Sequence, residues 1–264
     1  MSKPPAKSVV EPNPMDPHSS EIGFSLWRRL LIILTIGAVL GTLIIPFNPV
    51  MDKMYRLAFL AALLGDWLGP LLLVWHRKPL RWGWLVASFL LAMPFALPGH
   101  RMNDVELRDA YVLRMQELSS TKYVWGGESS RGIDCSGLPR KALRDTLLSY
   151  GIRHCDGGAL REFAGQWWFD ASAKALGEGY RRYTVPLAPH GSIQQMDYSG
   201  LQPGDLAVTT SGVHILAYLG GEMWIQAEPG IGAVAILNGR HDPNVWFKQP
   251  VTTHRWSVLR HGED

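Results

Sequence analysis

The chain has 264 residues, of which 47% are hydrophobic and 19% charged, and its formal net charge is +3. The charge is unevenly distributed. Residues 1–103 carry ten Lys and Arg against five Asp and Glu, whereas residues 104–264 carry sixteen against eighteen. The C-terminal part therefore lacks the basic surface that a nucleic-acid partner requires, and nucleic-acid binding is excluded. Long apolar runs in the first hundred residues also exclude a single soluble globule.

The first hundred residues predict a membrane domain over 27–100. Residues 1–26, with five prolines in the first twenty positions, are expected to form a disordered cytoplasmic tail. Apolar runs follow at 30–47, 57–75 and 80–97, each near the minimum length for crossing a hydrocarbon core of roughly 30 Å. The long polar stretch before the first run does not fit a cleaved signal peptide. These runs predict three transmembrane helices that are retained as an anchor.

Basic residues in the short loops predict how the spans are oriented. With three spans, the side richer in Lys and Arg holds Arg28, Arg29, Arg77, Lys78 and Arg81. That side is expected to be cytoplasmic, so the N-terminus lies inside and residues after 100 face the extracytoplasmic side. The third run is the weakest, with Pro94 and Pro98 near its end, and with only two spans the C-terminal part would be cytoplasmic. Asp66, inside the second run, is expected to be protonated or packed against a neighbouring helix.

The C-terminal part predicts an α+β domain. Helical spacing covers 104–119, with Asp104 as a possible cap, then the segment from Cys135 to Gly151, and then 161–176. Residues 180–187 look extended. Short strands separated by Gly and Pro turns are predicted at 206–209, 213–219, 223–227, 233–237 and 255–259. Helices followed by an antiparallel sheet are typical of the α+β class.

Cys135 is the most reactive residue that the sequence suggests. It follows a glycine-rich turn and comes at the start of a helix, with Asp134 as the expected N-cap. Free N–H groups and the helix dipole at such a position favour a thiolate, so a lowered pKa is expected for the thiol. A disulfide with Cys155 is the alternative in an oxidising compartment. Because a disulfide would disable the nucleophile, Cys155 is expected to be buried or remote if Cys135 is catalytic.

The motif Tyr123-Val-Trp-Gly-Gly, the motif Gly132-Ile-Asp-Cys-Ser-Gly-Leu, the turn Pro203-Gly-Asp-Leu and a following His-bearing strand resemble the NlpC-type family of bacterial cell-wall cysteine peptidases. The resemblance covers about residues 104–260. It implies a papain-like α+β catalytic domain over 104–264, peptidoglycan peptides as substrate, and no metal or other cofactor. It also implies an insertion at about 151–196, whose Trp167 and Trp168 could cap the substrate groove or contact the membrane.

The resemblance implies a catalytic triad. Cys135 matches the nucleophile, His214 the base, and Gln226 the third polar residue, which is commonly His but also Asn or Gln. The residues themselves support the pairing of His214 with Gln226. A turn at Gly220 and Gly221 joins their strands, and the even separation of twelve residues can place both side chains on one face. The simpler alternatives are a buried structural histidine and a packing glutamine.

Three further residues are expected to border the site. Tyr123 matches a family tyrosine near the nucleophile, and its hydroxyl could join the backbone N–H of Cys135 in stabilising an oxyanion. Asp134 and Ser136 match positions that border the substrate, although capping is the more economical role for Asp134.

The function that follows is a membrane-anchored cysteine endopeptidase that hydrolyses peptidoglycan stem peptides. In the family the typical bond is that between γ-D-glutamate and diaminopimelate. Two alternatives stay open. One is a thiol-dependent amidase or acyltransferase that acts on another substrate at the membrane surface, and the other is an inactive membrane scaffold.

Overall fold

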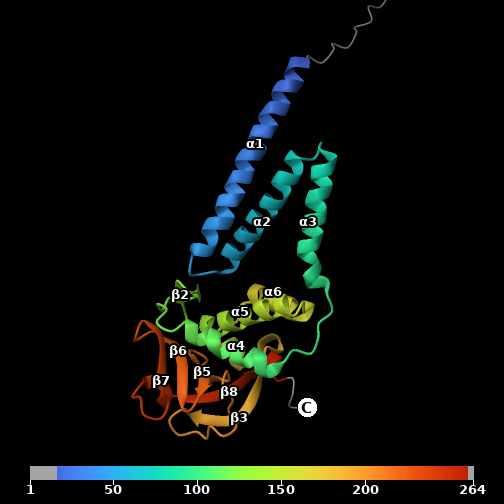
Figure 1. Ribbon diagram of the computed structural model, residues 1–264. Coiled ribbons are helices and arrows are strands. Elements are labelled where there is room, and N and C mark those ends of the chain that lie inside the picture. The colour runs from blue at the N-terminus through green and yellow to red at the C-terminus, as the bar shows by residue number, and fades with distance from the viewer. Residues whose placement is uncertain (1–16, 261–264) are drawn as a thin grey trace, which may run out of the picture.

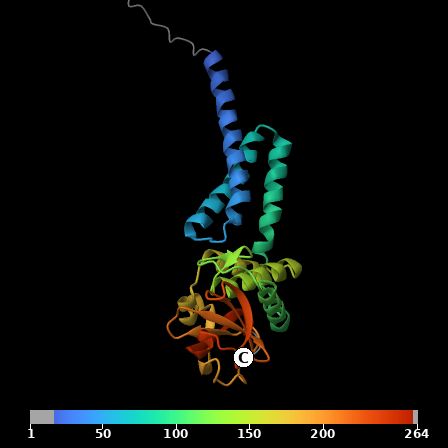
Figure 2. The same ribbon diagram turned by 90° about the vertical axis from the view of Figure 1, so that its left-hand side faces the viewer.

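A computed structural model describes residues 17–260 of the chain, which form a helical bundle at one end and a mixed domain at the other (Figure 1). The bundle consists of α1 (Pro17–Ile44), α2 (Lys53–Leu73) and α3 (Lys78–Ala96). Each contains a segment long and apolar enough to cross a membrane. The start of α1 points away from the mixed domain, whereas the connection between α1 and α2 lies against it (Figure 2).

The first helix is longer than the sequence predicted. It begins at Pro17, so the expectation of a disordered tail is wrong for residues 17–26, and residues 1–16 lie outside the described part. The physical reason is that an apolar helix propagates cheaply once it is formed. Proline is also tolerated at a first helical position, because the N–H that it lacks would have no partner there.

Small residues bring α1 and α2 together. A Cβ placed on Gly65 would collide with Ala38, and one placed on Gly69 would collide with Thr35, so glycine is needed for this close approach. Asp66 lies in the same contact and accepts a hydrogen bond from Thr42 Oγ1 at 2.6 Å. Its packing against α1 is one of the two outcomes expected for this acid.

The mixed domain confirms the α+β class, with helices first and an antiparallel sheet after them. Its helices are α4 (Asp104–Glu117), α5 (Gly137–Arg153), α6 (Gly157–Trp168) and α7 (Ala173–Gly177).

A small hairpin pairs β1 (Glu128–Ser129) with β2 (Gly132–Ile133). The main sheet has the order β3-β8-β4-β5-β6-β7, and every neighbouring pair is antiparallel. Its strands are β3 (Thr184–Ser192), β4 (Leu206–Thr209), β5 (Ile215–Gly220), β6 (Met223–Glu228), β7 (Ala233–Asn238) and β8 (Pro250–Trp256). Short 3-10 helices are η1 (Ile45–Phe47), η2 (Tyr180–Arg182), η3 (Val245–Lys248) and η4 (Ser257–Leu259).

Three details differ from the expected elements. The single helix expected at 161–176 is two helices, because Phe169 is extended and Ser172 caps the new helix α7. The strand expected at 255–259 lies earlier, as β8. The cap of α4 is Asn103 rather than Asp104, since the Asn103 side chain accepts from the N–H groups of Val105 and Glu106.

Helices α4 and α5 cover one face of the sheet and form the main core with it. Buried side chains of this core include Leu107 and Tyr111 from α4 and Leu143 from α5. The indole of Trp256 on β8 lies among them and donates a hydrogen bond to the Tyr111 hydroxyl at 2.8 Å. This packing holds the start of α5 against the start of β5, where the candidate site lies.

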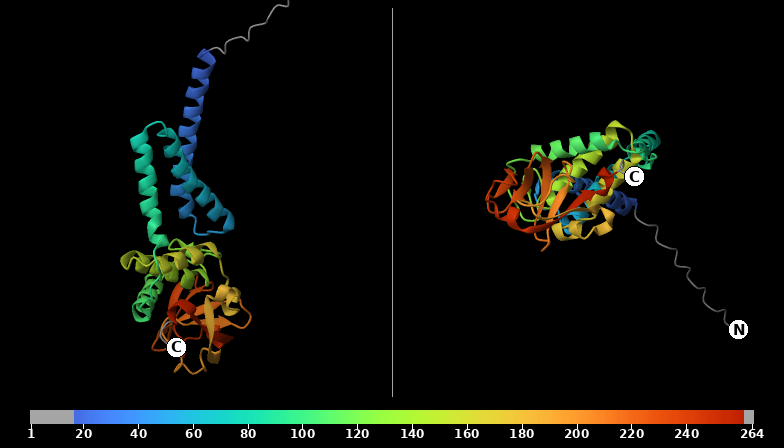
Figure 3. Two further views of the ribbon diagram at one scale, coloured as in Figure 1. Left: turned by 90° about the vertical axis from the view of Figure 1, so that its right-hand side faces the viewer. Right: turned by 90° about the horizontal axis from the view of Figure 1, so that it is seen from below.

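The mixed domain also contacts the helical bundle directly. Helices α5 and α6 lie between the bundle and the sheet (Figure 3). Arg161 on α6 donates hydrogen bonds to the carbonyls of Phe95 and Leu97 at the end of α3. Val50, in the connection between α1 and α2, forms an antiparallel bridge with Gly127. The two parts are therefore in contact through both the α1–α2 connection and the end of α3, as well as through the chain.

Candidate active site

Cys135 lies in a tight turn between β2 and α5. The Asp134 carboxylate organises this turn by accepting from Gly137 N at 2.6 Å and from Ser136 Oγ at 3.0 Å. Its other oxygen accepts from Gly126 N at 2.9 Å. Asp134 therefore caps the helix start and also ties the glycine-rich loop to it. Gly137 has no room for a side chain, because a Cβ there would collide with the carbonyl oxygen of Gly127.

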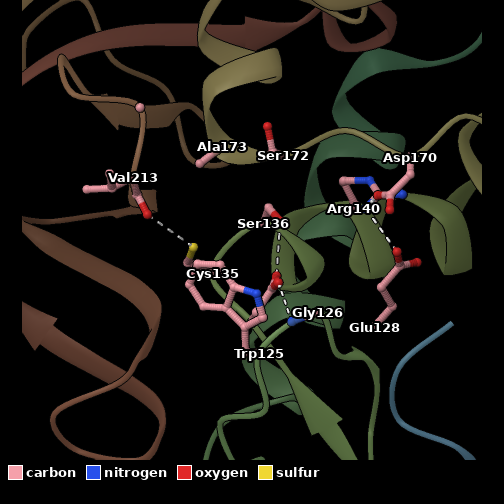
Figure 4. A pocket seen from close by; sticks show the side chains of 12 residues that line it. Trp125, Gly126, Glu128, Cys135, Ser136, Arg140, Asp170, Ser172, Ala173 and Val213 are labelled. Atoms are coloured by element: carbon pink, nitrogen blue, oxygen red, sulfur yellow. Dashed lines mark hydrogen bonds and ion pairs between the residues drawn. The ribbon is translucent and has the colours of Figure 1, made fainter. Parts of the chain in front are cut away.

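A cavity of about 350 Å³ opens beside the Cys135 thiol (Figure 4). Trp125 and Gly126 of the glycine-rich loop line one side of it, and Val213, just before β5, lines another. Ser172 and Ala173 approach from α7 and the turn that precedes it. At the far end lie Glu128, Arg140 and Asp170. The cavity thus offers a nucleophile at one end and charged groups at the other.

The thiol of Cys135 is buried, with 7% of the residue exposed. Sγ donates to the carbonyl of Val213 at 3.9 Å, and the N–H of Ile215 bonds to the sulfur. Burial, followed by the charge of Asp134, raises the pKa of Cys135 to about 12. The expectation of a lowered pKa is therefore wrong, because desolvation of the thiolate outweighs the backbone N–H groups that favour it.

His214 and Gln226 come together as the sequence predicted. Ala217 pairs with Ile225, which puts Gln226 opposite Leu216 and diagonal to His214 on the same face. His214 Nε2 lies 2.6 Å from Gln226 Oε1. Because an amide oxygen only accepts, this contact places the imidazole proton on Nε2 and leaves Nδ1 able to take up a proton.

The surroundings of His214 favour its neutral form. The ring stacks on Trp246, with 4.1 Å between centroids and 17° between planes. Burial lowers the pKa of His214 to about 4, while Gln226 and Glu228 act in the opposite direction. In the part of the chain that the structure describes, no hydrogen bond joins Cys135 to His214. The thiol instead bonds to the two residues that flank His214 in sequence.

Tyr123 and Ser136 also lie beside the nucleophile. The backbone N–H of Tyr123 donates to Gly232 O at 2.8 Å. This bond holds Tyr123 beside the turn that precedes β7, an edge strand of the sheet. Burial and the neighbouring Cys135 raise the pKa of Tyr123 to about 12, so its hydroxyl stays a hydrogen-bond donor at neutral pH. Ser136 lines the cavity and donates to Asp134. The structure thus brings Tyr123, Asp134 and Ser136 around the thiol.

The sequence did not predict the charged cluster at the far end of the cavity. Glu128 Oε1 lies 2.7 Å from Arg56 Nη2 and 3.1 Å from Arg140 Nη1, and Oε2 lies 2.5 Å from Arg144 Nη1. Asp170 pairs with Arg140 Nη1 as well. Burial by itself would raise the pKa of Glu128, but the three guanidinium groups outweigh it and lower the value to about 2. Arg140 and Arg144, four apart on one helix face, were the available sequence signal.

Two other expectations concern Cys155 and the insertion. Both cysteines are free, and Cys155 is exposed at the opposite end of α5 from Cys135. In the insertion, Trp167 and Trp168 do not line the cavity beside Cys135. Trp167 packs on Phe59 of α2 with 6.3 Å between ring centroids, and the carbonyl of Trp168 accepts from Arg56. Within residues 17–260, no group of three or more His, Cys, Asp or Glu side chains could hold a metal.

The chain is similar to several solved structures. NlpC2 from Trichomonas vaginalis is 16% identical, with a TM-score of 0.39 over 59% of this chain and 49% of that one. An NlpC/P60 family protein from Bacillus cereus is 19% identical, with a TM-score of 0.38 over 56% and 40%. The chain thus spans about half or less of the length of these two structures.

A further solved structure is the peptidoglycan hydrolase RipB from Mycobacterium tuberculosis, which is 20% identical, with a TM-score of 0.36 over 61% of this chain and 70% of that one. No curated protein sequence matches the chain. The model of the NlpC/P60 family matches residues 120–254, more than half of the chain, and this range includes Cys135, His214 and Gln226. The chain belongs to the NlpC/P60 family.

Proposed function

We propose that the protein is a membrane-anchored cysteine peptidase that hydrolyses an amide bond in peptidoglycan stem peptides. One observation carries this proposal. A buried thiol at the edge of a cavity bonds to the two residues that flank His214, and His214 is in turn bonded to Gln226 at 2.6 Å. Acyl transfer through a thiol needs a nucleophile, a base beside it and a group that orients the base.

The proposed reaction begins from a neutral pair. With the pKa of Cys135 near 12 and that of His214 near 4, both groups are uncharged at neutral pH. His214 Nδ1 removes the thiol proton as Sγ attacks the amide carbonyl, and Gln226 Oε1 keeps the ring oriented through Nε2–H. The carbonyl oxygen of the tetrahedral intermediate would be stabilised by the backbone N–H of Cys135 and by the Tyr123 hydroxyl.

The second half releases the product. The imidazolium of His214 gives its proton to the leaving amine, and an acyl thioester remains on Cys135. Water, deprotonated by His214, then attacks this thioester and regenerates the thiol. Asp134 would contribute by holding the glycine-rich loop against the start of the helix. Ser136 would lie beside it in the wall that faces the substrate.

The substrate is proposed from the family and from the location. One solved relative is a peptidoglycan hydrolase, and three helices at the N-terminal end could anchor the chain in a bacterial inner membrane. We propose that residues 27–100 form this anchor and 104–264 the catalytic domain on the extracytoplasmic side. The bond between γ-D-glutamate and diaminopimelate is the first to test.

The direct test uses the full-length protein in detergent with purified stem peptides and mass spectrometry of the products. Wild type and a Cys155→Ser variant should release the same fragments, whereas Cys135→Ala should release none. The proposal is wrong if Cys135→Ala retains the products.

A topology measurement tests the location. Alkaline phosphatase fused after residue 264 should be active, and the same fusion after residue 77, between the second and third helices, should be inactive. The reverse pattern would place the site in the cytoplasm, away from the cell wall, and would remove the proposed substrate from reach.

A further inference from the structure

The connection between α1 and α2 is built into the wall of the cavity. We call residues 45–56 the membrane hairpin; they comprise η1, the loop after it and the first turn of α2. Its Val50 bridges to Gly127, and the carbonyl of Pro49 accepts from the N–H of Glu128 at 2.9 Å. The membrane hairpin therefore forms an isolated β-bridge and a backbone hydrogen bond with the loop that carries Trp125, Gly126 and Glu128.

Arg131 strengthens this contact from the other side of the β1–β2 hairpin. Its guanidinium lies over the ring of Phe47, 4.2 Å from the centroid, and donates to the carbonyl of Pro46 at 3.4 Å. A Cβ on Gly132 would come within 3.0 Å of the Pro49 Cβ. The two loops are thus in close van der Waals and hydrogen-bonding contact.

Arg56 extends the contact to Glu128, which lines the cavity. Its side chain is 2% exposed, donates to Glu128 Oε1 at 2.7 Å and donates to the carbonyl of Trp168 at 3.3 Å. The Asp52 side chain caps the first turn of α2 and so fixes where Arg56 emerges. A guanidinium buried in this way is costly unless it is paired, so its pairing with Glu128 is a specific structural feature.

Glu128 links Arg56 to the wall of the cavity. It is the central acceptor for Arg56, Arg140 and Arg144, and both Glu128 and Arg140 line the cavity. The loop before Glu128 is tied to Asp134 through the N–H of Gly126, so its position also fixes the wall beside the thiol. The position of Arg56 in the membrane helix thus sets the geometry of one substrate wall.

We propose that Arg56 is a positioning residue of the active site, and that the membrane hairpin completes the substrate pocket through the contact of Arg56 with Glu128. The inference rests on the proposed function and deepens it, because the anchor then takes part in substrate binding as well as in location. His214 directly precedes β5 and Gln226 lies on β6. None of the hairpin contacts given above involves these two residues, so we expect Arg56 to affect KM more than kcat.

A second contact between the two parts provides a matched control. Arg161 on α6 donates to the carbonyls of Phe95 and Leu97 at the end of α3, so it also joins the membrane helices to the mixed domain. It does not line the cavity beside Cys135. Arg161→Gln should therefore loosen the attachment of the membrane helices without changing the substrate wall.

The experiment compares Arg56→Gln, Arg56→Lys, Arg161→Gln and Glu128→Gln in the full-length protein in lipid nanodiscs, with stem-peptide hydrolysis as the assay. Arg56→Gln should raise KM roughly tenfold, because the wall formed by Glu128 and Arg140 must then be ordered when substrate binds, and should leave kcat within about twofold. Arg56→Lys should give an intermediate KM. The double variant Arg56→Gln/Glu128→Gln should be no worse than Glu128→Gln.

Amide hydrogen exchange gives a readout that needs no substrate. Arg56→Gln should speed exchange in residues 124–134, and Arg161→Gln should not. If Arg56 only stabilised the fold, Arg56→Gln would lower the apparent kcat in proportion to the fraction of protein that is folded and would leave KM unchanged. If Arg56→Gln does not fold, Arg56→Lys is compared with wild type in the same two measurements.

Three results would overturn the inference: an unchanged KM and exchange rate in the folded Arg56 variant, an equal rise in Arg161→Gln, or additive effects of Arg56→Gln and Glu128→Gln. Failure of the proposed function is distinguishable from these. If wild type cleaves no stem peptide, the substrate proposal falls, while the exchange of residues 124–134 still decides whether Arg56 positions the loop.

Discussion

His214 Nε2 and Gln226 Oε1 are 2.6 Å apart, in side chains that belong to residues no more than 2% exposed. The contact orients the imidazole through a neutral acceptor. A carboxylate at the same place would stabilise the imidazolium, whereas an amide orients the ring without adding charge. Burial, which this contact only partly offsets, lowers the pKa of His214 to about 4. His214 is therefore neutral across the physiological range, and this has consequences for the pH dependence of the proposed reaction.

The variant Gln226→Glu tests the role of this contact. Activity requires neutral His214, so the acidic limb of the kcat/KM profile follows the imidazole pKa. A carboxylate beside Nε2 raises that pKa, and the acidic limb should move to higher pH. Gln226→Ala, which removes the orienting group, should lower kcat by roughly tenfold to a hundredfold without that movement. An unchanged profile in both variants would show that Gln226 only packs in the core.

The thiol itself should behave as a buried, neutral cysteine. Since burial and Asp134 raise the pKa of Cys135 to about 12, the thiolate fraction grows about tenfold for each pH unit below that value. In a Cys155→Ser background, the rate of alkylation by iodoacetamide should therefore rise steadily from pH 7 to pH 10. A rate that is already constant above pH 6 would indicate a preformed thiolate and imidazolium pair and would contradict the neutral starting state.

Glu128 should make the folded state sensitive to acid. Its pKa in the folded state is about 2, below the ordinary 4.5, so its contribution to stability is present above pH 4.5 and is lost as the pH falls toward 2. A shift of this size corresponds to roughly 3 kcal/mol. Glu128→Gln should therefore reduce the loss of melting temperature between pH 7 and pH 3. Glu117→Gln, at a half-exposed ion pair on α4, is the control and should leave that loss unchanged.

A second buried ion pair holds the sheet together. Asp205 is fully buried, and its carboxylate accepts from Arg255 Nε and Nη2, both at 2.8 Å. Asp205→Ala would leave a buried guanidinium without this partner and should lower the free energy of unfolding by about 3–5 kcal/mol. The exposed pair of Lys174 and Glu178 offers the comparison, since Glu178→Gln should cost less than about 1 kcal/mol. Equal effects in denaturant titrations would show that burial of the pair does not matter.

Local patterns in the sequence were sufficient to predict much of the architecture. The three apolar helices follow from runs of side chains that only lipid or a core can accommodate. The α+β order, and the pairing of His214 with Gln226, follow from spacing along strands that are joined by a short turn. The tail was mispredicted because helix propagation from α1 depends on neighbouring turns rather than on composition.

The sequence by itself determined the family motif, the three apolar segments and the pairing of His214 with Gln226, because each of these depends on residues close along the chain. Only the tertiary structure decided the protonation states, since the pKa of Cys135 depends on how much of the fold excludes water from it. It also decided that Arg56 meets Glu128, 72 residues away. A long-range ion pair leaves no local pattern, because its geometry exists only after the helical bundle and the sheet domain have packed together.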